Sequence, residues 1–287
     1  MKVFVTAGTG VVGTALVSEL RSRDVEVSVL TRSAENAEAL PEGVRGVVGD
    51  LLDHKLLLEE FAAADAVFLN LPVGEAETYQ GLLAVDAARR SGVGHVVYVS
   101  IQDLENLFTP PHCGVKVAVE KALKASGVPY TILRRSELMQ NDIGAKDMLL
   151  MGVYGIPLGE IGVSRVDVRD VAEVAAVVLT SPGHEGRTYT VTGPEPVTGQ
   201  FVTDTWKRVL GVEIAYVGGD LESCSLILNQ MMPQHLARDL WLMYEHYDHN
   251  GYVAAAEDIE AVTKLLGRPP RSFTEFAEET AQAWKAA

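Results

Sequence analysis

The sequence predicts an α/β fold, in which a doubly wound parallel sheet carries helices on both faces and is followed by a smaller, mostly helical C-terminal lobe. Strand patterns rich in β-branched residues alternate with helical patterns over the first half of the chain, as in repeated β-α units. From about residue 198 the pattern becomes mostly helical, with Gly and Pro between the segments. We therefore expect a sheet domain over residues 1–155, and a mixed segment over residues 156–287 that completes the sheet and forms the lobe.

Six strands are expected in the sheet domain, each a short apolar run. They span residues 3–5, 25–30, 44–48, 66–71, 95–100 and 130–133. Gly92 and Gly127 each follow a helical pattern and precede one of these strands, which is typical of a helix C-terminus. Ser272 and Glu275 have the spacing of a capping box, so the last helix is expected to begin there.

Composition restricts the class of partner. The chain of 287 residues is 47% hydrophobic, enough for a substantial core, and its net charge of -15 argues against nucleic acid as a partner. The two cysteines, Cys113 and Cys224, are far apart and have no ligand-spaced neighbours, so no metal site is expected. No apolar run reaches membrane-spanning length. We expect a cytoplasmic protein with a small-molecule substrate and no membrane partner, and the sequence leaves a homodimer open.

The N-terminal strand runs directly into glycines at G-x-G-x-x-G spacing, with a helix expected over about residues 11–21. This strand-turn-helix context is typical of a Rossmann-type dinucleotide site, in which the helix N-terminus faces a pyrophosphate. A glycine turn with a purely structural role is the alternative, and the context favours the nucleotide. The expected contacts are Gly8, Thr9, Gly10, Val11, Val12 and Gly13.

The end of the second strand indicates which nucleotide is bound. An NAD site usually has a carboxylate there, about 20 residues past the glycines, to accept hydrogen bonds from the ribose hydroxyls. This chain instead has Arg32 and Ser33, a guanidinium and a hydroxyl that suit a 2′-phosphate. We therefore expect NADP(H) to be preferred over NAD(H). The alternative is that Arg32 is an ordinary solvated residue at a strand end.

The remaining cofactor contacts are expected after the carboxyl ends of other strands, because ligands of doubly wound sheets bind along that edge. Asp50 could accept a hydrogen bond from the adenine amino group, or only cap the next helix, and the sequence does not decide between these roles. The full expected set is Asp50, Leu51, Asn70, Leu71, Pro72 and Ser100.

An ordered series of motifs covers most of the chain. It comprises the glycine turn, residues 98–100, 116–120, 126–134, 139–141, 166–172 and 189–195. Together these motifs resemble the NmrA-like family of atypical short-chain dehydrogenases/reductases. The resemblance implies a Rossmann domain with a small C-terminal lobe and a substrate cleft between them. Members of the family include NADPH-dependent quinone and dye reductases, and also nucleotide-binding regulators that catalyse nothing.

The chain departs from the family at the turn and at the expected catalytic helix. The family's turn usually reads Gly-Ala-Thr-Gly, whereas this chain has Ala7 and Gly8 at its first two positions. Standard short-chain dehydrogenases use Tyr-x-x-x-Lys, whose tyrosine donates a proton to a carbonyl oxygen. This chain keeps the spacing but has His112 before Lys116, so reduction of simple ketones is disfavoured.

Lys116 is the residue we expect to hold the nicotinamide ribose, with Glu120 one turn later on the same helix face to orient it. The alternative is an exposed Lys-Glu pair of little energetic consequence. His112 could supply a proton near neutral pH. It could equally lie at an exposed helix start, since two prolines precede it.

The acceptor side is expected to include the segment that follows the sixth strand. By resemblance, Glu137, Met139, Gln140 and Asn141 are substrate-side residues. Trp241, Tyr244 and Tyr247 recur every three residues, and this stripe is either core packing or a surface for a planar substrate, with Trp241 and Tyr244 as the candidate contacts.

The resulting functional hypothesis is an NADPH-dependent reductase that transfers hydride to a small conjugated acceptor, such as a quinone or an enone. Such acceptors leave a delocalised product that water can protonate, so no positioned tyrosine is required. The alternative is a non-catalytic NADP(H)-binding redox sensor that acts through a protein partner.

Overall fold

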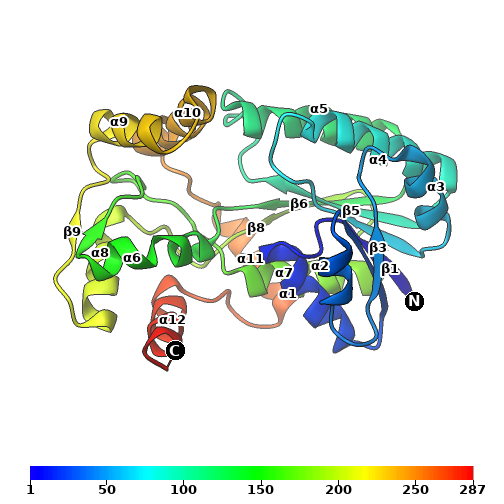
Figure 1. Ribbon diagram of the computed structural model, residues 1–287, viewed down its shortest axis with the longest axis horizontal. Helices are drawn as coiled ribbons and strands as arrows, with labels where there is room; N and C mark the ends of the chain where they lie inside the picture. Colours follow the sequence, from blue (N-terminus) through cyan, green and yellow to red (C-terminus); the bar gives the residue numbers. More distant parts are fainter. Residues whose placement is uncertain (287) are drawn as a thin grey trace. The chain divides into compact units, whose positions relative to one another are not determined.

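A seven-stranded sheet in the order β3-β2-β1-β4-β5-β6-β8 forms the centre of the fold (Figure 1). The strands are β1 (Lys2–Val5), β2 (Glu26–Thr31), β3 (Arg45–Val48), β4 (Ala66–Leu69), β5 (His95–Ile101), β6 (Tyr130–Arg135) and β8 (Arg187–Val191). Neighbouring strands from β3 to β6 pair in parallel. The strand order reverses between β1 and β4, where a doubly wound sheet binds its ligand. The predicted fold class and all six predicted strands are confirmed.

The computed structural model describes residues 1–286. The chain forms two compact units. The first comprises Met1–Leu104, His112–Arg135 and Val168–Tyr189, and the second comprises Glu105–Pro111, Ser136–Asp167 and the chain from Thr190 onward. The division predicted at residue 155 stays a prediction. No helix within residues 1–286 is both long enough and apolar enough to cross a lipid bilayer.

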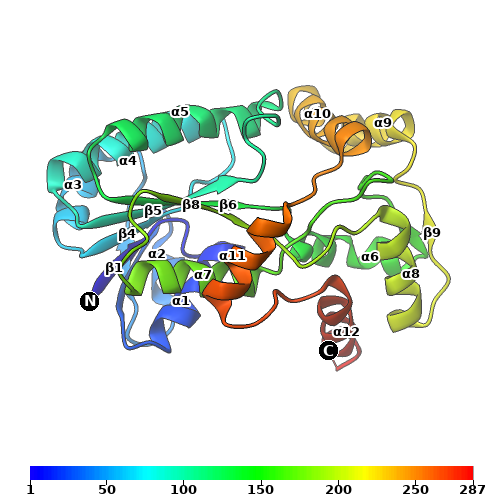
Figure 2. The ribbon, with the colours of Figure 1, turned by 180° about the vertical axis from the view of Figure 1, so that it is seen from behind.

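Helices cover both faces of the sheet in the first unit. They are α1 (Val11–Arg21), α2 (Ala34–Glu38), α3 (His54–Ala62), α4 (Glu77–Ser91), α5 (Pro111–Ala125) and α7 (Val168–Thr180). Helices α3, α4 and α5 lie on one face (Figure 1), and α1 packs beside α7 on the other (Figure 2). On the α3-α4-α5 face, the buried Phe4 and Phe61 rings meet edge to face, with centroids 5.6 Å apart. Their burial fixes the sheet against these helices.

Two helix ends predicted from glycines are confirmed. Gly92 ends α4 with a φ of 71°, and Gly127 follows α5 with a φ of 78°. Both angles lie in the left-handed region, which glycine adopts without steric penalty. Each helix can therefore stop abruptly and return the chain to the next strand.

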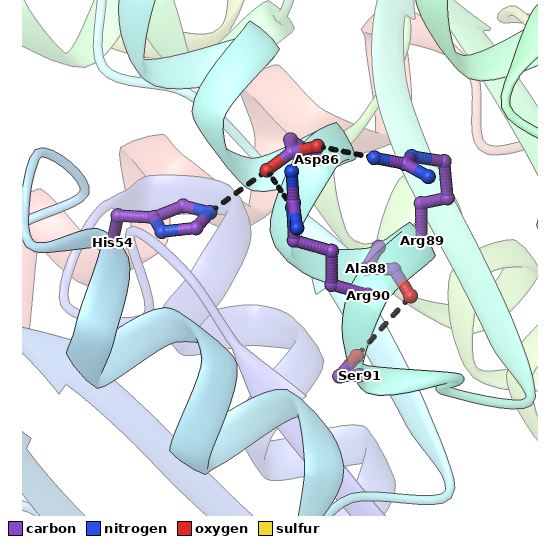
Figure 3. A network of polar contacts seen from close by, with 6 residues as sticks. All are labelled: His54, Asp86, Ala88, Arg89, Arg90 and Ser91. Atoms are coloured by element: carbon purple, nitrogen blue, oxygen red, sulfur yellow. Dashed lines mark hydrogen bonds and ion pairs between the residues drawn. The ribbon is translucent and has the colours of Figure 1, made fainter.

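An ion-pair cluster on the surface joins α3 to α4 (Figure 3). The Asp86 carboxylate of α4 is 3.0 Å from Nε2 of His54, the first residue of α3, and contacts Arg89 and Arg90 of its own helix at 2.9 and 2.7 Å. Hydrogen bonds from Arg89 and Arg90 lower the pKa of Asp86 to about 2. The cluster is partly solvated, so it aligns the two helices more than it stabilises them.

The second unit is mostly helical beyond residue 198, as predicted. Its elements are η1 (Met139–Ala145), α6 (Lys146–Leu150), β7 (Val153–Tyr154), α8 (Gly199–Leu210), β9 (Ala215–Tyr216), α9 (Leu221–Met231), α10 (Gln234–Asn250), α11 (Ala256–Leu266) and α12 (Phe273–Ala286). Trp206 is fully buried here and stacks on Trp284, with ring centroids 5.3 Å apart. The capping box that begins α12 is confirmed, because Ser272 and Glu275 exchange hydrogen bonds.

A fully buried arginine forms the polar centre of the second unit. The Arg165 guanidinium contacts the Asp142 carboxylate at 2.9 Å and lies 3.5 Å from Oε1 of Glu137. Asp142 also accepts a 2.8 Å hydrogen bond from the Trp206 indole. Burial opposes the charge on Arg165, but Asp142 and its neighbours outweigh that effect and raise the pKa of Arg165 above its ordinary value. The arginine therefore remains charged inside the unit.

Candidate functional site

The glycine turn joins β1 to α1 and is closely packed. Gly10 is the N-cap of α1, and its amide donates a 3.0 Å hydrogen bond to the Ala7 carbonyl. A Cβ atom on Gly13 would lie 2.3 Å from that same carbonyl oxygen, and one on Gly8 would lie 2.5 Å from Cγ1 of Val29. Side chains are therefore excluded at positions 8 and 13, which lets the chain pass closely in front of the helix N-terminus, where backbone amides can bind an anion.

The two valines after the turn lie in different environments. Val11 is 58% exposed at the first position of α1, whereas Val12 is buried in the core. The Val12 side chain is turned into the core, so its predicted contact would be through the backbone. The predicted contacts at both positions stay predictions.

Ala7 adopts a backbone conformation that the family's usual glycine would adopt freely. Its φ is 48°, one of three positive values among the non-glycine residues within 1–286. Left-handed backbone is unfavourable for any residue with a Cβ atom. The exchange of the first two turn residues thus leaves local strain at Ala7, while Gly8 keeps a side chain away from Val29.

A cavity of about 350 Å³ lies in the first unit, next to the glycine turn and the ends of β2 and β3. Its lining comprises Ala7, Thr9, Gly10, Leu30, Thr31, Arg32, Ser33, Asn36, Gly49, Asp50, Leu51, Pro72 and Gln80. Seven of the predicted cofactor residues are in this set: Thr9, Gly10, Arg32, Ser33, Asp50, Leu51 and Pro72. Four further lining residues, Ala7, Leu30, Thr31 and Gly49, lie within two residues of predicted ones. Asn36 and Gln80 were missed because neither stands in a recognisable motif, and only the packing of α2 and α4 brings them to the cavity.

Arg32 is the cationic residue of this lining. Its side chain is exposed at the end of β2 and makes no ion pair within residues 1–286. Ser33 beside it accepts a 3.2 Å hydrogen bond from the Asn36 amide and so caps the short helix α2. A guanidinium next to hydroxyl and amide groups is suited to a phosphate monoester.

Asp50 contributes the carboxylate of the cavity lining. Its Oδ1 accepts a 2.8 Å hydrogen bond from the Leu52 amide, so the side chain shapes the turn after β3. The next helix, α3, is capped by Asp53, whose side chain accepts from Leu56 at 3.1 Å. Asp50 is thus not the helix cap that the sequence offered as its alternative role.

Three other predicted cofactor residues lie at the carboxyl ends of β4 and β5, outside the cavity lining. The Asn70 backbone exchanges hydrogen bonds with the Thr6 hydroxyl, at 2.7 and 2.9 Å. Leu71 is buried in the core cluster beneath α4 and α5, and Ser100 is fully buried in β5. Their contact with a nucleotide stays a prediction.

Lys116 is buried on α5, but its partner differs from the one predicted. Its ammonium group pairs with the Glu77 carboxylate of α4. Glu120 instead accepts two 2.9 Å hydrogen bonds from Arg134 and one of 2.9 Å from Lys124. The prediction that Glu120 orients Lys116 was therefore wrong. Lys116 and Glu120 do share one face of α5, as predicted. However, Arg134 of β6 forms hydrogen bonds with Glu120, and the Lys116 ammonium pairs with Glu77 of α4 instead.

Burial raises the pKa of Glu120, but the hydrogen bonds from Arg134 and Lys124 outweigh that effect, so the net pKa lies below its ordinary value. Glu120 is therefore an ionised, structural partner of the β6 strand. The alternative of an exposed Lys-Glu pair is also wrong, since the side chains of Lys116 and Glu77 are 8% and 1% exposed.

His112 is half-buried in the first turn of α5, one turn before Lys116. Its Nε2 is 3.3 Å from the sulfur of Cys113. The spacing of His112 and Lys116 on one helix is as the sequence predicted. A catalytic role for His112 stays a prediction.

The segment that follows β6 belongs to the second unit. Glu137 is buried beside Arg165, Met139 is 1% exposed, and Asn141 is exposed. Gln140 donates a 3.2 Å hydrogen bond from Nε2 to Asp167. Of these residues, Glu137 belongs to the polar centre around Arg165. The role of all four toward a substrate stays a prediction.

The aromatic stripe of α10 packs largely within its own unit. Trp241 and Tyr244 are partly buried against the apolar cluster of α9 and α10, which contains Cys224, Leu228 and Ala237. Tyr247 is buried and stacks on Tyr252, with centroids 5.0 Å apart. Burial and the nearby Glu137 carboxylate raise the pKa of Tyr244 well above its ordinary value. The stripe thus contributes to core packing, and a further role of Trp241 and Tyr244 toward a substrate stays a prediction.

A glycine turn at a helix N-terminus, a cavity at the switch point of a parallel sheet, and a cation at the end of β2 together define a Rossmann-type nucleotide-binding protein. The sequence profile of the NmrA-like family matches residues 1–277. The chain belongs to the NmrA-like family.

Three relatives show how far this similarity extends. An NAD(P)H azoreductase from Xenophilus azovorans is 31% identical over an alignment that covers 99% of this chain and 100% of the relative. A (4-alkanoyl-5-oxo-2,5-dihydrofuran-3-yl)methyl phosphate reductase from Streptomyces griseus is 32% identical, over 98% of this chain and 99% of its own length. The crystal structure of an NADPH-dependent quinone oxidoreductase from Escherichia coli in complex with NADPH has the same fold. It superposes with a TM-score of 0.87 at 22% identity, covering 97% of this chain and 99% of the other.

Proposed function

We propose that this chain is an NADPH-dependent reductase that transfers hydride to a small conjugated acceptor such as a quinone or an enone. The observation that carries the proposal is the cavity beside the glycine turn, whose lining includes the guanidinium of Arg32. Two reductases that are 31% and 32% identical to this chain over nearly its full length support it.

The residues of the first unit fit a phosphorylated dinucleotide. The close packing at Gly8 and Gly13 keeps side chains out of the turn where a pyrophosphate would be held. Arg32 and Ser33 would hold the 2′-phosphate, which NAD(H) lacks, and Asp50 would accept a hydrogen bond from the adenine amino group. This arrangement supports a preference for NADP(H) over NAD(H).

The bound cofactor would supply the hydride, and the chain's own residues would bind, orient and keep water away from the reacting groups. Lys116 is proposed to hold the nicotinamide ribose. Quinones and enones suit this chain because the anion left by hydride addition is delocalised and can take its proton from water. An unactivated ketone needs a positioned acid, and the family's usual tyrosine is replaced by His112.

The acceptor side is assigned by the resemblance of the segment after β6. We assign Glu137, Met139, Gln140 and Asn141 to it, together with Trp241 and Tyr244 of α10. His112 is the candidate proton donor for acceptors whose product is less stabilised, since it stands four residues before Lys116, at the position of the family's usual tyrosine.

The test is NADPH oxidation by the purified protein across a panel of quinones, enones and cationic dyes. Acceptor-dependent oxidation supports the reductase, and a simple aliphatic ketone serves as the comparison, with little turnover expected because His112 replaces the family's usual tyrosine. Binding of both NADPH and NADP⁺ without turnover on any acceptor would overturn the proposal in favour of a redox sensor that acts through a partner.

A further inference from the structure

A buried ion pair joins the first turn of α4 to the middle of α5. Glu77, the first residue of α4, is 1% exposed, and its Oε1 accepts from the Lys116 ammonium. Lys116 is 8% exposed on its side chain. A lysine side chain is long and flexible, so a fixed partner is what sets the direction of its ammonium group.

Only half of the Glu77 carboxylate is satisfied by hydrogen bonds. Its second oxygen, Oε2, is buried and accepts no hydrogen bond within residues 1–286. The hydroxyl of Tyr98, fully buried in β5, is also without a hydrogen-bond partner in that part of the chain. Burial and then the nearby Glu77 carboxylate raise the pKa of Tyr98 well above its ordinary value, so the phenol stays neutral. Buried polar atoms left without partners are destabilising and are expected where function requires them.

The neighbouring pair on α5 shows the contrast. Both carboxylate oxygens of Glu120 are hydrogen-bonded, to Arg134 of β6 and to Lys124. That pair has all the hydrogen bonds expected of a structural ion pair. The environment of α5 as a whole therefore does not explain why one oxygen of Glu77 lacks a hydrogen bond.

Helix α4 also connects Glu77 to the nucleotide cavity. Gln80 lies one turn after Glu77 on the same helix and is among the residues that line the cavity. Residues three apart on a helix share a face. The first turn of α4 thus lines the cavity with Gln80 and binds the Lys116 ammonium with Glu77.

We propose that Glu77 is a positioning residue, which holds the Lys116 ammonium in the direction that the nicotinamide ribose requires. The proposal deepens the proposed function, on which it rests for the role of Lys116. It adds that α4, and not α5 itself, orients this lysine.

The experiment compares Glu77→Gln with the matched control Glu120→Gln in the full-length protein. Binding is measured with NADPH, by its fluorescence, and with adenosine 2′,5′-bisphosphate, which lacks the nicotinamide riboside. Glu77→Gln should weaken NADPH binding about tenfold, as expected for the loss of one charge-assisted contact. Binding of adenosine 2′,5′-bisphosphate should be unchanged, because Arg32 and the glycine turn are intact. Glu120→Gln should leave both affinities unchanged.

A second variant separates positioning from folding. In a Lys116→Met background, Glu77→Gln should have no further effect on NADPH affinity, because Glu77 acts through the lysine. Equal losses for both ligands, or full additivity with Lys116→Met, would overturn the proposal. These binding measurements do not need turnover. If the protein oxidises no NADPH, the proposed function is contradicted, but the binding measurements still decide the role of Glu77.

Discussion

At the scale of single residues, the turn at Ala7 and Gly8 combines strain with close packing. Ala7 has a φ of 48°, and a Cβ atom on Gly8 would lie 2.5 Å from Val29. The family's usual order, glycine before alanine, would relieve the backbone strain at position 7 but would place a Cβ atom against Val29 at position 8. The present order therefore reflects the position of Val29 beneath the turn.

Ala7→Gly should raise the free energy of unfolding by about 0.5–1 kcal/mol. Relief of left-handed strain outweighs the greater freedom that glycine has in the unfolded chain. Urea denaturation measures the change. Gly8→Ala is the matched variant and should instead destabilise by about 1–3 kcal/mol through overpacking against Val29. A loss of stability in Ala7→Gly would contradict this account of the turn.

Arg32→Ala should raise the KM for NADPH by about tenfold to a hundredfold, the range expected from the loss of a charged hydrogen bond. The KM for NADH should change little, because NADH has no 2′-phosphate. The control is Arg21→Ala, an exposed arginine at the end of α1 and outside the cavity lining. Steady-state kinetics with both cofactors provides the comparison, and parallel losses for NADPH and NADH would remove Arg32 from phosphate recognition.

Which site residues could be predicted depended on whether they stand in a local motif. Gly10, Arg32 and Asp50 were found because they follow strands at positions where a doubly wound sheet binds its ligand. Gln80 and Glu77 were not, since both lie on α4 and only the packing of that helix gives them their neighbours. The wrong partner for Lys116 has the same cause. Spacing along α5 identifies the residues that share a face of that helix. It does not identify which residues of other elements form ion pairs with them.

At the scale of elements, the sheet was predictable because its inner strands are continuous apolar runs. Strands β1 to β6 all coincide with predicted runs, with ends displaced by one or two residues. The segment after residue 155 was predicted to complete the sheet, but strand β8 was not located, because Arg187–Val191 alternates polar and apolar residues and is exposed over its first residues. It lies at the end of the sheet order, where one side is unpaired and a weaker hydrophobic pattern suffices.

Glu120→Gln should reduce stability near neutral pH by about 2 kcal/mol, because the contacts of Arg134 and Lys124 lose their charged acceptor. Since the pKa of Glu120 is lower in the folded protein than its ordinary value of 4.5, its stabilisation is present above that pH and is lost as the pH falls through the folded pKa. The difference between the wild type and the variant should therefore shrink below pH 4.5. Urea denaturation across this range tests the sign, and a difference that grows on acidification would contradict it.

At the scale of the whole molecule, the two units are stabilised by different means. The first buries apolar strands and helices against each other, whereas the second is built around Arg165, with Asp142 and Glu137 as its charged partners. Nothing in the local sequence indicates that Arg165 is fully buried, because an arginine is ordinarily exposed. The helical character of the second unit was predicted, but its polar centre was not.

Asp142→Asn should destabilise the second unit by about 3 kcal/mol, since it leaves the buried guanidinium of Arg165 with less compensating charge. Tryptophan fluorescence reports on this unit alone, as the three tryptophans, Trp206, Trp241 and Trp284, all lie within it. The denaturation midpoint followed by fluorescence should fall. Asp147→Asn, at an exposed aspartate of α6, should leave it unchanged. An unaltered midpoint in Asp142→Asn would show that the buried pair is not the stabilising centre of this unit.

We propose that the first unit holds NADPH and uses it for reduction. The most direct test is the ratio of kcat/KM for NADPH to that for NADH, with 1,4-naphthoquinone as the acceptor. The account predicts quinone-dependent turnover with a preference for NADPH of about tenfold or more, because Arg32 and Ser33 line the cavity where a carboxylate would otherwise select NADH. A ratio near unity, a preference for NADH, or the absence of turnover with either cofactor would contradict it.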